Sequence, residues 1–201
     1  MDKILVWDWP VRVGHWLLVG AFALAWLTGE SEERRLVHAY AGGTVVGVML
    51  FRLAWGLVGT HHARFASFVH GPGSVLGYLK GLLARRPAHT AGHNPAGGWA
   101  IVALLTLGLL AGASGWLAYQ DIGGDWLGEL HEGLTTAMLT LVGIHVASVI
   151  VSNFIHRENL VRAMLTGYKQ GGPGEAIAGP RPLAAVMLIG WVIACAWWLA
   201  R

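Results

Sequence analysis

The sequence predicts an all-α membrane protein in which five helices cross the lipid bilayer. The 201 residues are 55% hydrophobic and 12% charged, and the mean hydropathy is +0.53, outside the usual balance of a soluble domain. Five apolar runs are long enough for a hydrocarbon core of about 30 Å, which needs roughly 17 to 25 helical residues. No part of the chain shows the alternating segments of about ten residues that a membrane β-barrel would need.

The first apolar run, residues 13–29, follows a short stretch that carries Lys3 and Arg12. This charge pattern is similar to that of a secretory signal peptide. No small-residue cleavage pattern follows the run and it contains His15, so we expect it to be retained as a helix. The second run, 36–58, begins near His38 and contains Arg52.

The connection after the second run contains a stretch, 72–86, in which apolar and basic positions recur at helical spacing. It is too short to span a membrane, so we expect an interfacial helix. The third and fourth apolar runs are residues 97–119 and 130–155.

A stretch rich in Gly and Pro, residues 171–182, precedes the fifth run, 183–200. We therefore expect a four-helix core over 1–170, a linker over 171–182 and one additional membrane helix. Cys195, in this last run, is the only cysteine, and the chain has no CxxCH motif for covalent haem attachment.

Lysine and arginine predict the orientation, because cytoplasmic loops carry the excess of these residues. Ten of them fall in the N-terminal stretch and in the connections 59–96 and 156–182, against three on the other side: Arg34, Arg35 and Arg201. The 120–129 connection is acidic. We expect a cytoplasmic N-terminus and a periplasmic C-terminus, and a pI of about 9.4 that reflects loops near anionic lipid rather than nucleic-acid binding.

Two histidines, His131 and His145, lie near opposite ends of the fourth run. Fourteen residues separate them, which is about 21 Å along a helix and four turns at the 3.5-residue repeat of left-handed bundles. The two side chains are therefore expected on one face of the helix, at opposite depths in the membrane.

The first two runs supply one histidine each at these depths. His15 is expected at the depth of His145, and His38 at the depth of His131. Helices that face each other can hold a cofactor between their side chains. A haem iron with two imidazole ligands has both axial positions filled and passes single electrons. The pattern therefore predicts two haem groups, one held by His15 and His145 and one by His38 and His131.

Arg52 lies fourteen residues beyond His38, on the same helix face and at the depth of His15 and His145. An arginine within a span costs on the order of 2.5–3.5 kcal/mol at the membrane centre. Two interpretations stay open: the arginine neutralises a haem propionate, or its side chain extends to the inner headgroups. Among the histidines of the inner connections, His61, His62 or His93 is a candidate for contact with a quinone headgroup or a propionate; the others are His70, His89 and His156.

Several motifs together resemble those of the bacterial cytochrome b561 family, which includes the cytochrome b subunits of nickel-iron hydrogenases and is similar to those of formate dehydrogenases. They are WDWPVRVGHW with His15, LVHAYAG with His38, FRLAWGLVGTHHARFASF, GHNPAGGW before the third run, and the His131/His145 pair. The resemblance covers roughly residues 5–170. It implies a four-helix core with two haem b groups that exchanges electrons between the quinone pool and a partner redox protein.

We therefore expect a multi-pass protein of the bacterial inner membrane that transfers electrons, or the membrane subunit of a quinone-linked oxidoreductase. The expected partners are membrane lipid, quinone and a redox protein such as a c-type cytochrome, a hydrogenase or another dehydrogenase. The acids of the 121–129 loop would attract a basic cytochrome. Two alternatives stay open: a histidine-lined transporter of metal ions or protons, and a haem-bearing anchor for a soluble redox subunit.

Overall fold

The computed structural model describes residues 2–84 and 90–201. Five of the described helices are long and apolar enough to cross a membrane. They are α1 (Trp9–Thr28), α2 (Arg35–Val58), α4 (Pro95–Tyr119), α5 (Trp126–His156) and α7 (Pro182–Leu199). The all-α membrane fold and each of the five predicted spans are thereby confirmed.

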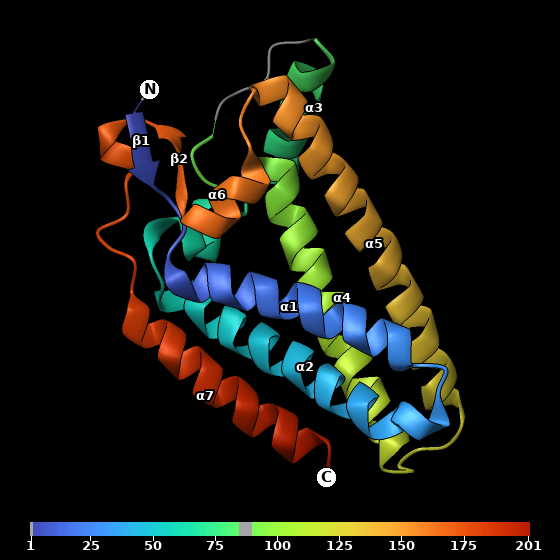
Figure 1. Cartoon of the computed structure of the whole chain (residues 1–201). Helices are drawn as coiled ribbons and strands as arrows, with labels where there is room; N and C mark the ends of the chain where they lie inside the picture. The colour runs from blue at the N-terminus through green and yellow to red at the C-terminus, as the bar shows by residue number, and fades with distance from the viewer. Residues whose placement is uncertain (1, 85–89) are drawn as a thin grey trace.

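The membrane helices form two layers (Figure 1). In one layer α1 packs along α2 and α2 packs along α7, and in the other α4 packs along α5. The layers meet at the turns that join α1 to α2 and α4 to α5, and they diverge toward the end where the N-terminus lies. The C-terminus follows the end of α7 that lies away from the N-terminus.

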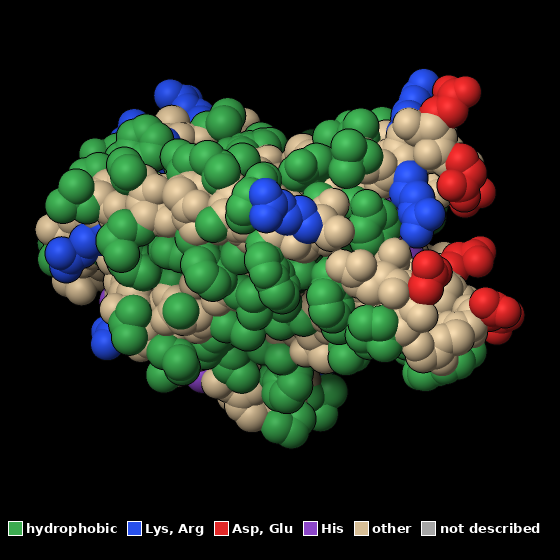
Figure 2. Space-filling model, turned by 90° about the horizontal axis from the view of Figure 1, so that it is seen from below, with side chains coloured by type: hydrophobic (Ala, Val, Ile, Leu, Met, Phe, Trp, Pro, Cys, Tyr) green, Lys and Arg blue, Asp and Glu red, His purple; other side chains and the backbone are tan. Residues whose placement is uncertain are grey.

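The turns where the layers meet carry most of the acidic side chains, and we call this the acidic end of the molecule. Figure 2 shows these acids gathered at one edge of the view. Seven exposed acids belong to the two turns and their flanking residues: Glu30, Glu32, Glu33, Asp121, Asp125, Glu129 and Glu132. The turn between α1 and α2 contains a short 3-10 helix, η1 (Glu32–Arg34).

Short elements cover the other end, which we call the capped end. They are the helices α3 (Pro72–Leu83) and α6 (Leu160–Thr166), the strands β1 (Asp2–Leu5) and β2 (Tyr168–Gly171), and the 3-10 helices η2 (His61–Ala63), η3 (Phe65–Ser67) and η4 (Pro173–Glu175). α3 begins where the helix over 72–86 was predicted to begin, and it covers that prediction up to Leu83. Arg85, Arg86 and His89 lie outside the described residues.

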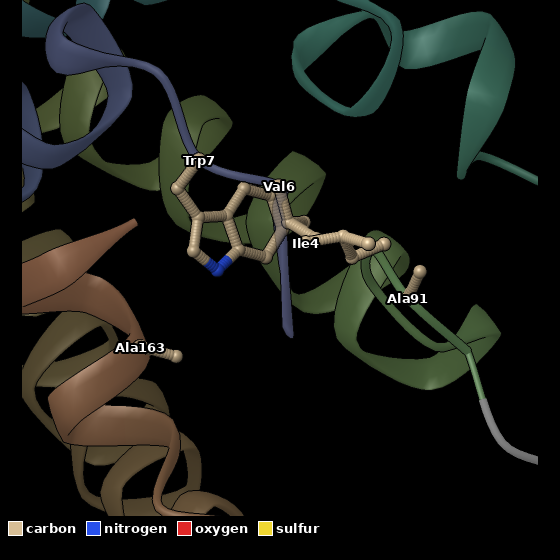
Figure 3. Packing of buried hydrophobic residues seen from close by; sticks show 5 residues of the cluster. All are labelled: Ile4, Val6, Trp7, Ala91 and Ala163. Carbon is tan, nitrogen blue, oxygen red and sulfur yellow. The ribbon is translucent and has the colours of Figure 1, made fainter. Parts of the chain in front are cut away.

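The two strands, which the sequence did not predict, pair antiparallel and join the N-terminus to the segment before α7. Ile4, Val6 and Trp7 then pack with Ala91 and with Ala163 of α6 to form a small buried core (Figure 3). The amide of Ile177 donates to the carbonyl of Leu5, so the segment predicted as a linker is bonded to β1. The division into core, linker and additional helix stays a prediction.

Asp8 explains why α1 begins where it does. Its Oδ1 accepts a hydrogen bond from the amide of Val11 at 3.0 Å, which caps the helix, and Pro10 occupies the first turn, where no amide donor is needed. Asn94 caps α4 in the same way, by accepting from the amide of Gly97 at 2.7 Å, and Pro95 follows it. The Asp8 cap sets where α1 begins and therefore where His15 lies on it. The Asn94 cap marks the point at which the loop before α4 ends.

Candidate functional site

His38 of α2 and His131 of α5 face each other near the acidic end, with both side chains half-buried. Their ring centroids are 6.0 Å apart and their planes are nearly perpendicular, at 82°. A metal–imidazole bond is about 2 Å long, and a coordinating nitrogen lies about 1 Å from its ring centroid. Two imidazoles on opposite faces of one iron therefore have centroids about 6 Å apart. The pair has the separation that a shared metal requires.

Backbone carbonyls of two other helices orient this pair. His38 Nδ1 lies 2.8 Å from the carbonyl oxygen of Ala25 on α1, and His131 Nδ1 lies 2.8 Å from that of Ala111 on α4. Because a carbonyl only accepts, each Nδ1 carries the proton and donates it. The other nitrogen, Nε2, is then unprotonated on both rings and available to a metal, which is the usual arrangement of a metal-binding histidine.

A glycine on α4 makes room for the ring of His131. A Cβ atom built at Gly115 would lie 2.6 Å from Nδ1 of His131 and 2.7 Å from its Cε1. No side chain larger than hydrogen fits there unless the ring moves. The position of this histidine therefore depends on α4 in two ways, through the Ala111 carbonyl and through Gly115.

His15 of α1 and His145 of α5 form the second predicted pair, toward the capped end. Both side chains are half-buried, and they are close enough to interact electrostatically. The ring of His15 also contacts that of Trp16 edge-on, with centroids 5.3 Å apart. Within the described parts of the chain, neither ring of this pair makes a hydrogen bond, so its nitrogens are not assigned as they are in the first pair.

A cluster of buried apolar side chains lies between the two depths. It includes Val45 of α2, midway between His38 and Arg52, and Met138 of α5, midway between His131 and His145. Ala21, Met49 and Leu105 complete the cluster. In the described residues, no group of three or more His, Cys, Asp or Glu side chains is arranged to hold a metal ion. The four histidines therefore lie as two separate pairs, at two depths, rather than as one cluster.

Arg52 lies at the capped-end depth, as its spacing from His38 predicts. Its guanidinium carbon is 5.0 Å from the ring centroid of Phe65 and 5.7 Å from that of Phe68. Both terminal nitrogens, Nη1 and Nη2, are buried, and neither has a hydrogen-bond partner among the residues that the structure describes. Such donors are costly in a protein interior, and an anionic group with several acceptor oxygens, such as a haem propionate, would satisfy them.

Asp8 is the charged neighbour that the sequence analysis missed. Its side chain is fully buried, and besides capping α1 it accepts from Trp55 Nε1 at 2.9 Å and Thr60 Oγ1 at 2.7 Å. It also interacts electrostatically with Arg52. The aspartate in WDWP, just before the observed start of α1, was the available signal for the cap, but its long-range partners depend on the fold.

His93, in the loop before α4, packs between two aromatic rings. Its ring lies 4.6 Å from that of Trp7 and 4.8 Å from that of Phe68. Burial, and then the nearby charge of Arg52, hold the pKa of His93 well below its usual value, so the ring is neutral at pH 7. Its Nδ1 is buried and has no hydrogen-bond partner in the described part of the chain.

The other capped-end histidines differ in surroundings. His62 is buried, and its Nε2 lies 2.7 Å from the carbonyl oxygen of Glu175, while His61 is exposed and packs edge-on against it. His70 Nδ1 bonds the carbonyl of Phe68. His156 ends α5. Of the three histidines considered for a quinone or a propionate, only His93 has an unpartnered buried nitrogen near Arg52.

Comparison with known proteins gives one family and a set of relatives. The family model described as prokaryotic cytochrome b561 matches residues 6–167. A probable Ni/Fe-hydrogenase B-type cytochrome subunit of Bradyrhizobium diazoefficiens is 25% identical, over 83% of this chain and 86% of the relative. The corresponding protein of Rhodobacter capsulatus is 24% identical, over 83% and 81%.

A probable Ni/Fe-hydrogenase 1 B-type cytochrome subunit of Escherichia coli K12 is 27% identical, over 58% of this chain and 60% of the relative. No solved structure matches the chain. The matched region contains all four paired histidines and Arg52, and it ends before α7.

Proposed function

Since the chain belongs to the prokaryotic cytochrome b561 family, we propose that it carries electrons across the membrane through two b-type haems, between quinone and a partner redox protein. The family and its relatives establish the coarser part of this statement, a multi-pass membrane protein that transfers electrons through haem b. The number of haems, their ligands, the quinone and the orientation are our proposals.

The acidic-end haem is proposed to lie between His38 and His131. The observation that carries this assignment is the 6.0 Å separation of the two rings, combined with the donation of both Nδ1 protons to backbone carbonyls. A haem with two histidine ligands supplies one-electron exchange at its iron. The residues of the chain hold the two imidazoles in place from four helices, α1, α2, α4 and α5.

The capped-end haem is proposed to lie between His15 and His145. The support is their electrostatic proximity and the equal spacing, fourteen residues, between the two histidines of α5 and between His38 and Arg52 of α2. Arg52 is proposed to bind the propionates of this haem, and the burial of both its Nη atoms supports a propionate over the membrane headgroups. Neutral His93 offers a further donor beside Arg52.

The capped end is proposed to face the cytoplasm of a bacterial cell, and the acidic end the periplasm. The excess of Lys and Arg at the capped end supports this orientation. The relatives' names point to a hydrogenase as the kind of redox partner. The seven exposed acids at the acidic end would also attract a basic carrier such as a c-type cytochrome, since opposite charges accelerate encounter.

The division of the chain is proposed as the sequence suggests it, with a haem-binding core over 1–170, a linker over 171–182 and an additional helix over 183–200. The family match over residues 6–167, which leaves out α7, supports this division.

The number of haems tests the proposal directly. Purified protein should show a b-type spectrum after reduction with dithionite, and haem extracted with acidified acetone should amount to two groups per chain. All of it should be extractable, because the chain lacks a CxxCH motif. A ratio near one haem per chain would contradict one of the two pairs, and a protein without haem would contradict the function.

A further inference from the structure

One face of α1 lines a pocket that opens to the outside of the helix bundle and that the haem assignment does not use. Five residues at helical spacing form this face: Trp9, Arg12, Val13, Trp16 and Leu17. Met164 and Leu165 of α6 close the other side, and the pocket has a volume of about 370 Å³. Trp9, Trp16 and Leu165 are 43%, 38% and 54% exposed, so its mouth faces the surroundings of the bundle.

Among the described residues that line this pocket, Arg12 alone is charged. Its Nη2 donates to the carbonyl of Leu165, and its guanidinium carbon lies 4.5 Å from the ring centroid of Trp9. Its Nε is buried and, within the described residues, has no hydrogen-bond partner. The pocket thus combines apolar and indole walls with one cationic group that has an unused donor.

A second pocket, of about 500 Å³, lies on the same helix, α1. The two share Val13 and Leu17, and the second runs between α1, α2 and α7 as far as Trp197, near the C-terminal end of α7. In the part of the chain that the structure describes, no charged residue lines this second pocket. The two pockets together form a groove with a polar group at its capped end and an apolar path along the rest of the membrane.

We propose that this groove binds a long-chain quinone, with the headgroup beside Arg12, Trp9 and Trp16 and the isoprenoid tail between α1 and α7. The proposal rests on the quinone-linked function and gives that function a site. A quinone carbonyl accepts a hydrogen bond from a guanidinium, and its flat ring suits indole walls. α7 thereby gains a role, as one wall of the tail groove.

The surroundings favour a quinone over an anionic phospholipid. Lipid headgroups are recognised by clusters of basic residues, whereas a single arginine serves this pocket. The pocket also adjoins the proposed capped-end haem site, because the ring of Trp16 contacts that of His15, with centroids 5.3 Å apart. A redox-active ligand gains from this position, and a structural lipid does not.

Binding of two quinones of different length tests the proposal. Decylubiquinone has a ten-carbon tail and duroquinone has none, and each can be titrated into the purified haem-loaded protein and followed by quenching of tryptophan fluorescence. Arg12→Gln should lower the affinity for both probes at least tenfold. Leu165→Trp, which fills the pocket from an exposed position of α6, should do the same.

Two further variants sharpen the result. Ile193→Trp, at an exposed position of the tail groove, should lower the affinity for decylubiquinone several-fold and leave the affinity for duroquinone unchanged. Arg162→Gln, which removes an exposed arginine of α6 outside the pocket, should bind both probes as the wild type does. The haem content of every variant should equal that of the wild type.

The outcomes separate this inference from the function on which it rests. A wild type that binds neither probe would overturn the quinone-linked function itself. A wild type that binds both, with Arg12→Gln and Leu165→Trp unchanged, would overturn this site alone. Phosphatidylglycerol that co-purifies with the wild type and is lost in Arg12→Gln, while quinone binding persists, would assign the pocket to lipid and also overturn the inference.

Discussion

Two backbone carbonyls decide which nitrogen of each acidic-end histidine is free to bind a metal. The sequence predicts that His38 and His131 lie at one depth, because each lies near the start of its span and the two spans cross the membrane in the same direction. It does not predict that Ala25 and Ala111 accept their Nδ1 protons, since these carbonyls belong to neighbouring helices whose register is set by packing. Asp8 was missed for the same reason, because Trp55 and Thr60 lie far from it along the chain.

Gly115 provides a test of the orientation of His131. Gly115→Ala should displace the imidazole, because the added Cβ would lie 2.6 Å from Nδ1, and should thereby weaken or abolish binding of the acidic-end haem alone. Haem content should fall from about two groups per chain toward one. Gly20→Ala adds the same methyl group to α1 where nothing lies within 4 Å, and should leave haem content unchanged. Full haem content in Gly115→Ala would show that this ring does not need its present position.

Arg52 tests the propionate assignment through the redox potentials. A fixed positive charge favours the reduced, less positive haem, so Arg52→Leu should lower the potential of the capped-end haem. The acidic-end haem should change less, since the Coulomb energy falls with distance and is screened. A redox titration that resolves the two haems measures both effects. Two unchanged potentials would favour the alternative in which Arg52 extends to the membrane headgroups.

At the scale of elements, the membrane helices were predictable from the sequence, and the two strands of the capped end were not. Apolar length alone predicts the five spans, and caps such as Asp8 and Asn94 move the observed helix starts a few residues outward. The strands β1 and β2 are four residues each and lie more than 160 residues apart along the chain. So short a pair carries no usable periodicity, and its stability comes from the tertiary packing around Trp7.

The contact between α2 and α7 depends on two glycines one turn apart. A Cβ at Gly43 would lie 2.9 Å from the Cα of Ala196, and a Cβ at Gly47 would lie 2.9 Å from the Cβ of Cys195. Trp191 Nε1 donates to the carbonyl of Gly47 at 2.9 Å, which adds a hydrogen bond to this close approach. Small residues that bring two backbones together are a common way to join helices in membranes.

A matched pair of variants tests this contact. Gly47→Val should destabilise the protein by about 1–3 kcal/mol, the usual cost of overpacking, because α7 must move away from α2. Gly42→Val changes the same helix where nothing lies within 4 Å, and should cost much less. Thermal unfolding in detergent compares the two variants. Equal stabilities would show that α7 does not need its close packing against α2.

For the molecule as a whole, the distribution of charge predicts which end meets which partner. Of the ten lysines and arginines that the sequence predicts on the inner side, the eight that the structure describes belong to elements of the capped end or to the helix ends beside them. What the sequence could not show is that Glu30, Glu32 and Glu33 join the acids of the α4–α5 turn at one end, because that requires the two helix turns to meet. The acidic surface is therefore larger than the 121–129 loop suggests.

Cysteine labelling tests the proposed orientation. In a variant that lacks Cys195, cysteines placed singly at Gly174, in the cap, and at Asp125, at the acidic end, are both exposed. A membrane-impermeant thiol reagent added to intact cells should label the cysteine at position 125 and not the one at 174. Both should react after the membrane is opened. The reverse pattern in intact cells would invert the orientation but leave the histidine pairs as they are.

The most direct test of the central claim, that two histidine pairs hold two haems, is the haem content and midpoint potential of the four single variants His15→Ala, His38→Ala, His131→Ala and His145→Ala. Each is expected to keep about one haem per chain. His38→Ala and His131→Ala should retain haems of the same potential, that of the capped-end site, while His15→Ala and His145→Ala should retain the other. Loss of different haems from His38→Ala and His131→Ala, in variants that are folded and membrane-inserted, would contradict the pairing.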